Sequence, residues 1–233
     1  MKLALLGYGR MGKEIEKIAL ERGHEIVIKS NGEENYDITQ ADVAIDFSIP
    51  NSAFNNISTC INHNIPVVSG TTGWLDKYDD AVALCKEKKG GFIYASNFSL
   101  GVNIFFALNE KLAAMMNSQK QYTIDIEEIH HTKKLDAPSG TAITLAEGII
   151  DNSDKKKWEL DGEISDENIP IKAVRTPDVP GTHTINYNSE VDSIEIKHTA
   201  HNRKGFALGA VVAAEWLIGK EGVFSMRDVL NIG

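Results

Sequence analysis

The sequence predicts an α/β fold in which a parallel sheet covered by helices is joined to an α+β part with an open mixed sheet. Residues 2–100 alternate short apolar runs with amphipathic segments, which is the pattern of a parallel α/β sheet. A glycine-rich turn follows the first apolar run directly. Further along, β-like runs follow one another without helices between them, at 171–174, 182–188 and 191–198.

The end of the chain is predicted to rejoin the first part of the fold. Residues 205–218 return to helical spacing after the β-like runs. We therefore expect residues 1–100 and 205–233 to form one domain and residues 101–204 to form a second. Inside the second domain, the polar stretch 151–168 is predicted to be a surface connection.

Composition argues against several classes of function. The 233 residues carry a formal net charge of −9, which opposes binding to the phosphates of a nucleic acid. The only two cysteines, Cys60 and Cys85, lack metal-ligand spacing, so we expect packed free thiols in a reducing compartment and no metal site. The first apolar run is too short for a signal peptide, and no later segment approaches a membrane span, which predicts a cytoplasmic protein without a membrane partner.

A predicted strand, a glycine turn and a predicted helix open the chain. The turn reads Gly7-Tyr8-Gly9-Arg10-Met11-Gly12. This G-x-G-x-x-G spacing supplies a tight turn, close approach of a pyrophosphate to the backbone, and phosphate binding at the helix N-terminus. The sequence thus predicts a Rossmann-type domain that binds NADPH or NADH, with an ordinary glycine turn as the alternative.

Lys29 stands near the end of the second predicted strand, where an acidic residue usually binds the ribose hydroxyls. A lysine followed by Ser30 can contact a 2′-phosphate, so we expect NADPH to be accepted at least as well as NADH. Two alternatives stay open. Glu33 or Glu34 could reach the ribose instead, or Lys29 could be a solvated strand end.

Three more loops follow the ends of predicted strands. In parallel sheets ligands lie beyond the carboxyl ends of the strands, so these loops are predicted to border the cofactor cleft. Taken singly, each could equally be an ordinary strand-end turn. The loops are Asp46-Phe47-Ser48, Gly70-Thr71-Thr72-Gly73 and Ala95-Ser96-Asn97-Phe98-Ser99.

Residues 127–142 combine two histidines, two lysines and a helix-start signal. Apolar and polar residues alternate just before them, which predicts a strand that ends in His130 and His131. Helical spacing of the apolar residues from Ala142 onward predicts a helix that begins near Ser139.

The start of this helix is a predicted anion site. A helix N-terminus presents free N–H groups, here those of Gly140 and Thr141, and Lys134 would add a positive charge. With His130 and His131 nearby, the run predicts an anionic substrate beside a proton-transfer group. The alternative is a basic surface loop with two solvated histidines.

The run from Glu128 to Ala142 fits the signature E-x-H-H-x-x-K-x-D-A-P-S-G-T-A, and in this the chain resembles the dihydrodipicolinate reductases, also called 4-hydroxy-tetrahydrodipicolinate reductases. The resemblance covers most of the chain. Supporting matches are Gly9-Arg10-Met11-Gly12, Asp46-Phe47-Ser48, Gly70-Thr71-Thr72-Gly73, Asn97-Phe98-Ser99-Leu100-Gly101-Val102-Asn103, and His198-Thr199-Ala200 with Arg203, Phe206, Ala207 and Gly209.

Three features depart from the family pattern. The glycine loop is one residue shorter than the common form, and Ser96 replaces the usual proline, which both bear on the fit of the cofactor. Arg175-Thr176-Pro177-Asp178 replaces an expected Arg-Gly-Gly turn between substrate-domain strands, although Gly181 and His183 still match.

The resemblance implies an NAD(P)H-binding Rossmann domain built from both chain ends, a substrate domain between them, and a homotetramer assembled through the substrate-domain sheets. It implies hydride transfer from the nicotinamide to a cyclic 4-hydroxy dicarboxylate with loss of water, a step of diaminopimelate and lysine biosynthesis. His130 would then be the proton donor or acceptor, Lys134 a proton donor and His131 a substrate ligand, while Gly140 and Thr141 would bind a substrate carboxylate. The implied cofactor contacts are Gly7, Tyr8, Gly9, Arg10, Met11, Gly12, Gly70, Thr71, Thr72, Ala95, Ser96, Asn97 and Phe98.

Two other functions fit the same residues less fully. Another NAD(P)-linked reductase or dehydrogenase of a small anionic acid would keep the architecture, but the helix start at Ser139 beside the histidines favours a compact dicarboxylate. A non-enzymatic sensor of the nicotinamide redox state would leave that polar cluster unexplained.

Overall fold

The computed structural model describes residues 1–32, 36–202 and 204–232. The chain divides into two compact units, one containing Met1–Asn103 with Lys204–Gly233 and the other Ile104–Arg203. The segment after the second unit therefore returns to the first.

The first unit is built on a six-stranded parallel sheet. Its strands are β1 (Lys2–Leu6), β2 (Glu25–Ser30), β3 (Val43–Asp46), β4 (Val67–Ser69), β5 (Gly91–Tyr94) and β11 (Gly222–Phe224). They are arranged in the order β2-β1-β3-β4-β5-β11. The central strands are runs of buried side chains, as expected for strands covered on both faces. The strand order reverses between β1 and β3, which is the point where such sheets bind ligands.

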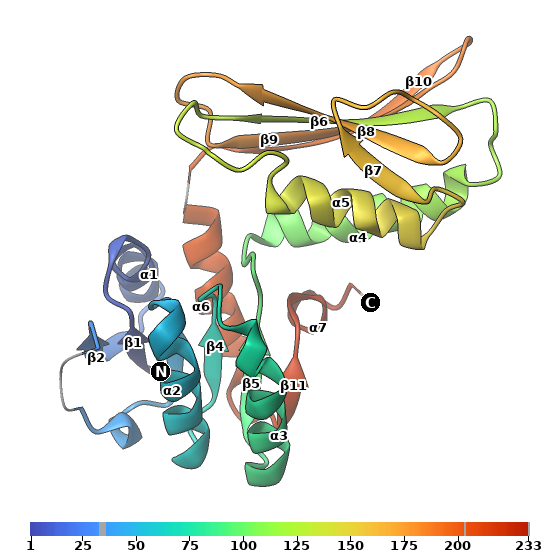
Figure 1. The fold of residues 1–233 in the computed structure, drawn as a ribbon. Helices are drawn as coiled ribbons and strands as arrows, with labels where there is room; N and C mark the ends of the chain where they lie inside the picture. Colours follow the sequence, from blue (N-terminus) through green and yellow to red (C-terminus); the bar gives the residue numbers. More distant parts are fainter. Residues whose placement is uncertain (33–35, 203, 233) are drawn as a thin grey trace. The chain divides into compact units, whose positions relative to one another are not determined.

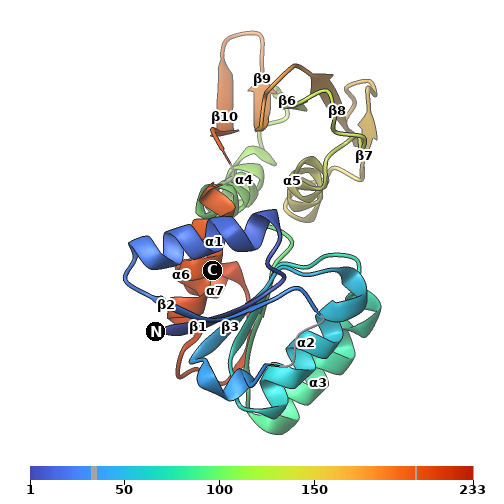
Figure 2. The ribbon, with the colours of Figure 1, turned by 90° about the vertical axis from the view of Figure 1, so that its left-hand side faces the viewer.

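Helices cover both faces of this sheet (Figure 2). One face is covered by α1 (Arg10–Glu21), α6 (Lys204–Leu217) and α7 (Met226–Leu230), and the other by α2 (Pro50–Asn62) and α3 (Tyr78–Lys88). Short 3₁₀ turns occupy Ile38–Gln40 and Leu75–Lys77. Each face has its own buried apolar cluster, and small side chains of α6 such as Ala210 and Ala214 let that helix pack closely on the sheet.

The second unit is built on a five-stranded mixed sheet. Its strands are β6 (Thr123–His130), β7 (Lys157–Leu160), β8 (Asn168–Arg175), β9 (Gly181–Asn188) and β10 (Ser193–Ala200). They are arranged in the order β10-β9-β6-β8-β7. Strand β8 is parallel to β6 and β7, whereas β9 is antiparallel to β6 and β10. Helix α4 (Leu100–Met116), which begins in the first unit, and helix α5 (Gly140–Asp151) cover one face of this sheet (Figure 1).

Strand β6 alternates between buried and more exposed side chains along its whole length. Ile124 and Ile126 belong to the core beneath the helices, and Glu128 and His130 continue the same buried row. The period of two therefore brings a carboxylate and an imidazole onto the core face of the sheet, where the apolar row ends.

The predicted fold class, a Rossmann-type parallel sheet with a second open mixed sheet, is confirmed. The prediction of a plain surface connection at 151–168 is wrong in part, because this stretch contains β7, which pairs with β8 at the edge of the sheet. Most of its side chains stay exposed, and Trp158 packs against the core. Cys60 and Cys85 are free and buried, as predicted. No helix within the described ranges is long and apolar enough to cross a membrane.

Helix α6 approaches the backbone of residue 98 so closely that only glycine fits at position 209. A Cβ added there would lie 1.6 Å from the carbonyl oxygen of Phe98. We therefore expect Gly209→Ala to lower the free energy of unfolding by about 3 kcal/mol or more, at the upper end of overpacking effects, in urea denaturation. Gly205→Ala in the same helix is the control, because its Cβ would lie 3.5 Å from Ser99 Oγ, an ordinary contact. Equal urea midpoints for the two variants would contradict this account.

Candidate active site

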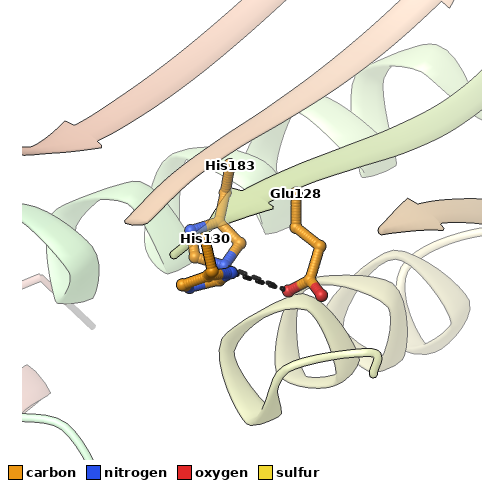
Figure 3. Close-up of side chains that lie close together, drawn as sticks. All are labelled: Glu128, His130 and His183. Atoms are coloured by element: carbon orange, nitrogen blue, oxygen red, sulfur yellow. Dashed lines mark ion pairs between the residues drawn. The ribbon is translucent and has the colours of Figure 1, made fainter. Parts of the chain in front are cut away.

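A cluster of polar side chains lies on the helix-covered face of the second unit's sheet. Glu128 and His130 come from β6, and His183 lies opposite Glu128 on β9. All three side chains are buried. Figure 3 shows the two imidazole rings together beside the Glu128 carboxylate. The ring centroids are 5.0 Å apart in an edge-to-face arrangement.

Both oxygens of the Glu128 carboxylate have partners. Oε1 accepts a hydrogen bond from Nη2 of Arg175 at 3.1 Å, and Oε2 accepts one from the backbone N–H of Ser139 at 3.0 Å. Nδ1 of His130 lies 3.4 Å from the same Oε2. A fully buried carboxylate is stable only with such partners. The Glu128 carboxylate therefore holds together β6, the end of β8 and the start of α5.

The imidazole of His130 has a pKa below that of a free histidine. Burial lowers the pKa of its imidazole, and the Glu128 carboxylate opposes that shift. The contact of Nδ1 with Glu128 has ion-pair distance but not hydrogen-bond geometry, so Nδ1 has no hydrogen-bond partner within the described part of the chain. On the other side of the ring, a Cβ at Gly181 would come to 3.0 Å from Nε2. Glycine at this position therefore leaves room beside Nε2.

His183 supports the start of helix α5. Its Nε2 lies 3.1 Å from Oγ of Ser139, and this hydroxyl accepts a hydrogen bond from the backbone N–H of Ala142. Burial lowers the pKa of His183 to about 3, so the ring is neutral at neutral pH. In the tautomer with its proton on Nδ1, Nε2 accepts the Ser139 hydroxyl hydrogen. Ser139 is thus the N-cap of the helix that the sequence predicted to begin near it, and a histidine contacts its side chain.

The predicted anion site is the first turn of α5. Gly140 is exposed and Thr141 is half-buried. The backbone N–H groups of both residues have no acceptor among residues 1–32, 36–202 and 204–232. The free N–H groups of the helix start therefore follow directly after Ser139, whose own N–H donates to Glu128.

Lys134 and His131 lie in the loop between β6 and α5. Nζ of Lys134 contacts both carboxylate oxygens of Asp136, at 2.9 and 2.7 Å, and this lowers the pKa of Asp136. The Lys134 charge also lowers the pKa values of His130 and His183, which places the ammonium group near both rings. His131 is half-buried, and its Nδ1 has no hydrogen-bond partner within the described part of the chain.

Sequence reasoning missed three residues of this cluster. Glu128 and His183 were noted only as family matches, and Arg175 only as the start of an unusual turn. The alternation that put Ile124 and Ile126 in the core also places Glu128 there, so a signal for Glu128 was present. The contribution of His183 and Arg175 depends on the pairing of β9 and β8 with β6, which no local pattern reveals.

Within the described ranges, one group of side chains has ligand atoms close enough together to hold a metal ion. It consists of Glu128, His130 and His183, whose ligand atoms all lie within 4.8 Å of one another. The guanidinium of Arg175 and the N–H of Ser139 already occupy the Glu128 oxygens. A positive charge 3.1 Å from one carboxylate oxygen opposes a second cation there, so the contacts favour a hydrogen-bonded network.

The glycine loop of the first unit has the close contacts that a dinucleotide cradle requires. Gly7 has φ of +98°, and a Cβ there would lie 2.1 Å from the carbonyl oxygen of Phe47. A Cβ at Gly12 would lie 2.4 Å from the oxygen of Gly7, whereas a Cβ at Gly9 would meet nothing within 4 Å. Gly9 is the N-cap of α1 and provides no side-chain cap. The loop is therefore tight at its base and open at the helix start, which fits a bound pyrophosphate.

Asp46 joins the loops that follow β3 and β4. Its buried carboxylate accepts four hydrogen bonds, from Ser48 Oγ, Asn56 Nδ2, Ser69 Oγ and Thr71 Oγ1, at 2.7 to 2.8 Å. Burial raises the pKa of Asp46, and these four donors oppose the shift.

The three predicted strand-end loops meet around Phe47. A Cβ at Gly70 would lie 2.3 Å from the Phe47 ring, and the rings of Phe47 and Phe98 are 5.7 Å apart. Phe98 itself is buried, with 1% of the residue exposed. The remaining predicted cofactor residues differ in exposure: Arg10, Thr72 and Ser96 are exposed, and Tyr8, Met11, Ala95 and Asn97 are half-buried, whereas Thr71 is buried.

Lys29 is not a free cation. Its Nζ lies 2.6 Å from Oε1 of Glu16 and 5.1 Å from the centre of the Tyr8 ring. The Tyr8 hydroxyl donates to the other oxygen of Glu16. An acidic residue thus reaches the end of β2 from helix α1 rather than from β2 itself. Glu33 and Glu34 lie outside the described residues.

A cavity of about 580 Å³ lies in the second unit, but it is at the other end of β6. Its lining includes Tyr122 and Ile124 at the start of β6 and Ile149 near the end of α5. None of the predicted site residues lines it.

Comparison with known proteins gives one consistent family. Residues 1–98 match the family described as "Dihydrodipicolinate reductase, N-terminus", and residues 101–230 match "Dihydrodipicolinate reductase, C-terminus". A 4-hydroxy-tetrahydrodipicolinate reductase from Christiangramia forsetii is 60% identical, covering 99% of this chain and 98% of the relative. One from Neisseria meningitidis serogroup A is 34% identical, covering 93% of this chain and 84% of the relative.

A solved structure extends the similarity to the fold. The dipicolinate-bound dihydrodipicolinate reductase from Paenisporosarcina sp. TG-14 superposes with a TM-score of 0.77 at 24% identity, covering 98% of both chains. Family matches to both halves and a relative at 60% identity over nearly the whole length agree with each other. The chain therefore belongs to the dihydrodipicolinate reductase family.

Proposed function

We propose that this chain is a 4-hydroxy-tetrahydrodipicolinate reductase, an NADPH- or NADH-dependent oxidoreductase of diaminopimelate and lysine biosynthesis. The observation that carries the proposal is the buried Glu128–His130 pair against the first turn of α5, because it puts a titratable imidazole beside free helix-start amides. Family membership and the name of the 60% identical relative supply the substrate. That substrate is (2S,4S)-4-hydroxy-2,3,4,5-tetrahydrodipicolinate, and the product is tetrahydrodipicolinate.

The second unit is proposed to bind the two carboxylates of the substrate. The N–H groups of Gly140 and Thr141 would donate to one carboxylate, which the partial positive charge of the helix start also favours. Lys134 would contact the substrate with its ammonium group, which Asp136 holds in position. His131, with an unpartnered ring nitrogen, would be a further substrate ligand.

His130 and Lys134 are the proposed proton-transfer groups. Bound NADPH or NADH supplies a hydride, and reduction of an unsaturated ring needs a positioned acid to supply the matching proton. Burial lowers the pKa of His130 in the free protein, and a dianionic substrate close to the ring would raise it again. The imidazole would therefore gain its proton when the substrate is present.

The first unit is proposed to hold the cofactor. The open helix start at Gly9 would bind the pyrophosphate, because the loop is tight only at its base. The loops joined by Asp46 and Phe47 would form the cleft wall. The proposed contacts are Gly7, Tyr8, Gly9, Arg10, Met11, Gly12, Lys29, Gly70, Thr71, Thr72, Ala95, Ser96, Asn97 and Phe98.

A homotetramer in the cytoplasm is the proposed form of the protein. The face of the mixed sheet opposite α4 and α5 supports assembly through the second unit, because no described helix covers it (Figure 1). Thr182 and Thr184, whose side chains lie on that face, are buried within the single chain. Light scattering of the purified protein should give four times the chain mass.

The function is tested by mixing the protein with NADPH and freshly prepared substrate and following the absorbance of the reduced nicotinamide. Oxidation that depends on both protein and substrate is expected. A reductase of another small anionic acid would bind NADPH yet leave its absorbance unchanged with this substrate, and a redox sensor would do the same with every acid tried. Either result would contradict the proposed activity.

Replacing His130 tests the proton-transfer assignment. We expect His130→Gln to lower kcat by roughly 10²–10⁴-fold, the usual contribution of a general acid, with little change in cofactor affinity. His63→Gln is the matched control, since His63 is an exposed histidine of the first unit. An unchanged kcat in His130→Gln would refute the role.

The Lys29–Glu16 pair should tune the choice of cofactor. Removing the cation in Lys29→Ala should lower kcat/KM for NADPH relative to NADH by about 2–5-fold, and Glu16→Gln should shift the ratio the other way, as expected for an exposed charge pair. Lys17→Ala is the control, because Lys17 pairs with Glu14 on the same helix as Glu16. If the ratio of kcat/KM for NADPH to that for NADH changes by the same factor in Lys29→Ala, Glu16→Gln and Lys17→Ala, Lys29 has no specific role in cofactor choice.

A further inference from the structure

Glu128 has the contacts of a group that organises the proposed site rather than of a residue buried for packing. It is fully buried, yet its contacts come from several elements of the candidate site. Arg175 comes from the end of β8, Ser139 caps α5, and His130 ends β6. Nε2 of His183, on β9, lies 3.8 Å from Oε2, so one carboxylate lies close to groups from four elements.

The two carboxylate oxygens of Glu128 contact different groups. Oε1 is occupied by the guanidinium of Arg175, whose Nη2 also donates to the carbonyl oxygen of Asp136 at 2.7 Å. Oε2 lies between the N–H of Ser139, at 3.0 Å, and Nδ1 of His130, at 3.4 Å. A shift of Oε2 would thus change the imidazole and the helix start together.

The position of Oε2 also selects one form of the His130 ring. A carboxylate next to Nδ1 favours a proton on Nδ1, which leaves Nε2 unprotonated. Nε2 is the nitrogen beside Gly181, where the missing side chain leaves room. When the ring takes up a second proton, the same carboxylate attracts the imidazolium.

We propose that Glu128 is the positioning residue of this site, whose Oε2 orients His130 with Nε2 as the proton-exchanging nitrogen and at the same time fixes the first turn of α5. This inference rests on the proposed role of His130 as the proton donor or acceptor. Arg175 completes the arrangement, because its guanidinium donates both to Glu128 and to the carbonyl oxygen of Asp136, in the loop that carries Lys134.

Glu128→Gln is the sharpest variant, because it keeps the shape and removes the charge. The amide oxygen would face Arg175, so the amide NH₂ group would face the N–H of Ser139 and Nδ1 of His130, where an acceptor is needed. We expect kcat to fall roughly 10–100-fold, as when the carboxylate that orients a working histidine is lost, and KM for the substrate to rise. Glu127→Gln is the control, since Glu127 is the neighbouring carboxylate on the same strand and its charge faces Lys172 at 3.4 Å.

The decisive measurement is nitrogen NMR of the imidazoles as a function of pH, assigned with His130→Gln. The charged or titratable groups near His130 are Glu128, Lys134, Arg175, Asp136 and His183. In the unaltered protein, we expect His130 to carry its proton on Nδ1 above its pKa. In Glu128→Gln, we expect a lower His130 pKa and a mixture of both tautomers, with no such change in Glu127→Gln.

The outcomes separate this inference from the proposed function. A proton on Nε2 in the unaltered protein would overturn it, and that measurement needs no variant that folds poorly. An unchanged His130 pKa and tautomer in a folded Glu128→Gln variant would also overturn it. If His130→Gln keeps full activity, the proton-transfer role fails instead, and the NMR result still decides whether Glu128 orients the ring.

Discussion

A carboxylate inside a protein must have hydrogen-bond donors or a cation at its oxygens, and each unit of this chain contains one at the carboxyl end of a strand. Asp46 ends β3 and accepts bonds from four side chains, which lie on two neighbouring loops, the end of β4 and helix α2. Glu128 lies near the end of β6 and joins a helix start, an arginine and a histidine. In both cases one buried carboxylate needs several hydrogen-bond donors, and the donors come from different segments of the chain. The carboxylate therefore holds those segments next to one another.

Local patterns predicted much of the fold. Alternation predicted β6, and helical spacing predicted α5 with a start near Ser139. Strand β7 was missed because it is short, polar and at a sheet edge, so its sequence resembles a loop. Its stability comes from pairing with β8. A local sequence pattern does not show which separate segments pair in a sheet.

The candidate site shows the same division. The helix start and the inward row of β6 were visible in the sequence, whereas the contacts of Glu128 with Arg175 and of Ser139 with His183 depend on the register of three strands. Nor did the sequence show that Lys29, which we expected to contact a 2′-phosphate, forms an ion pair with Glu16. Its partner Glu16 belongs to another element, and only the packing of α1 beside β2 brings the two charges together.

The return of the chain to its first unit has a consequence for synthesis on the ribosome. Helix α6 fills one face of the first sheet with Ala210, Val211 and Ala214, and β11 adds its edge strand. Both are translated after the whole of the second unit. The first unit therefore stays without part of its core until the second unit has been synthesised. Chains stalled near residue 203 would present an uncovered apolar sheet face, the kind of surface that chaperones bind.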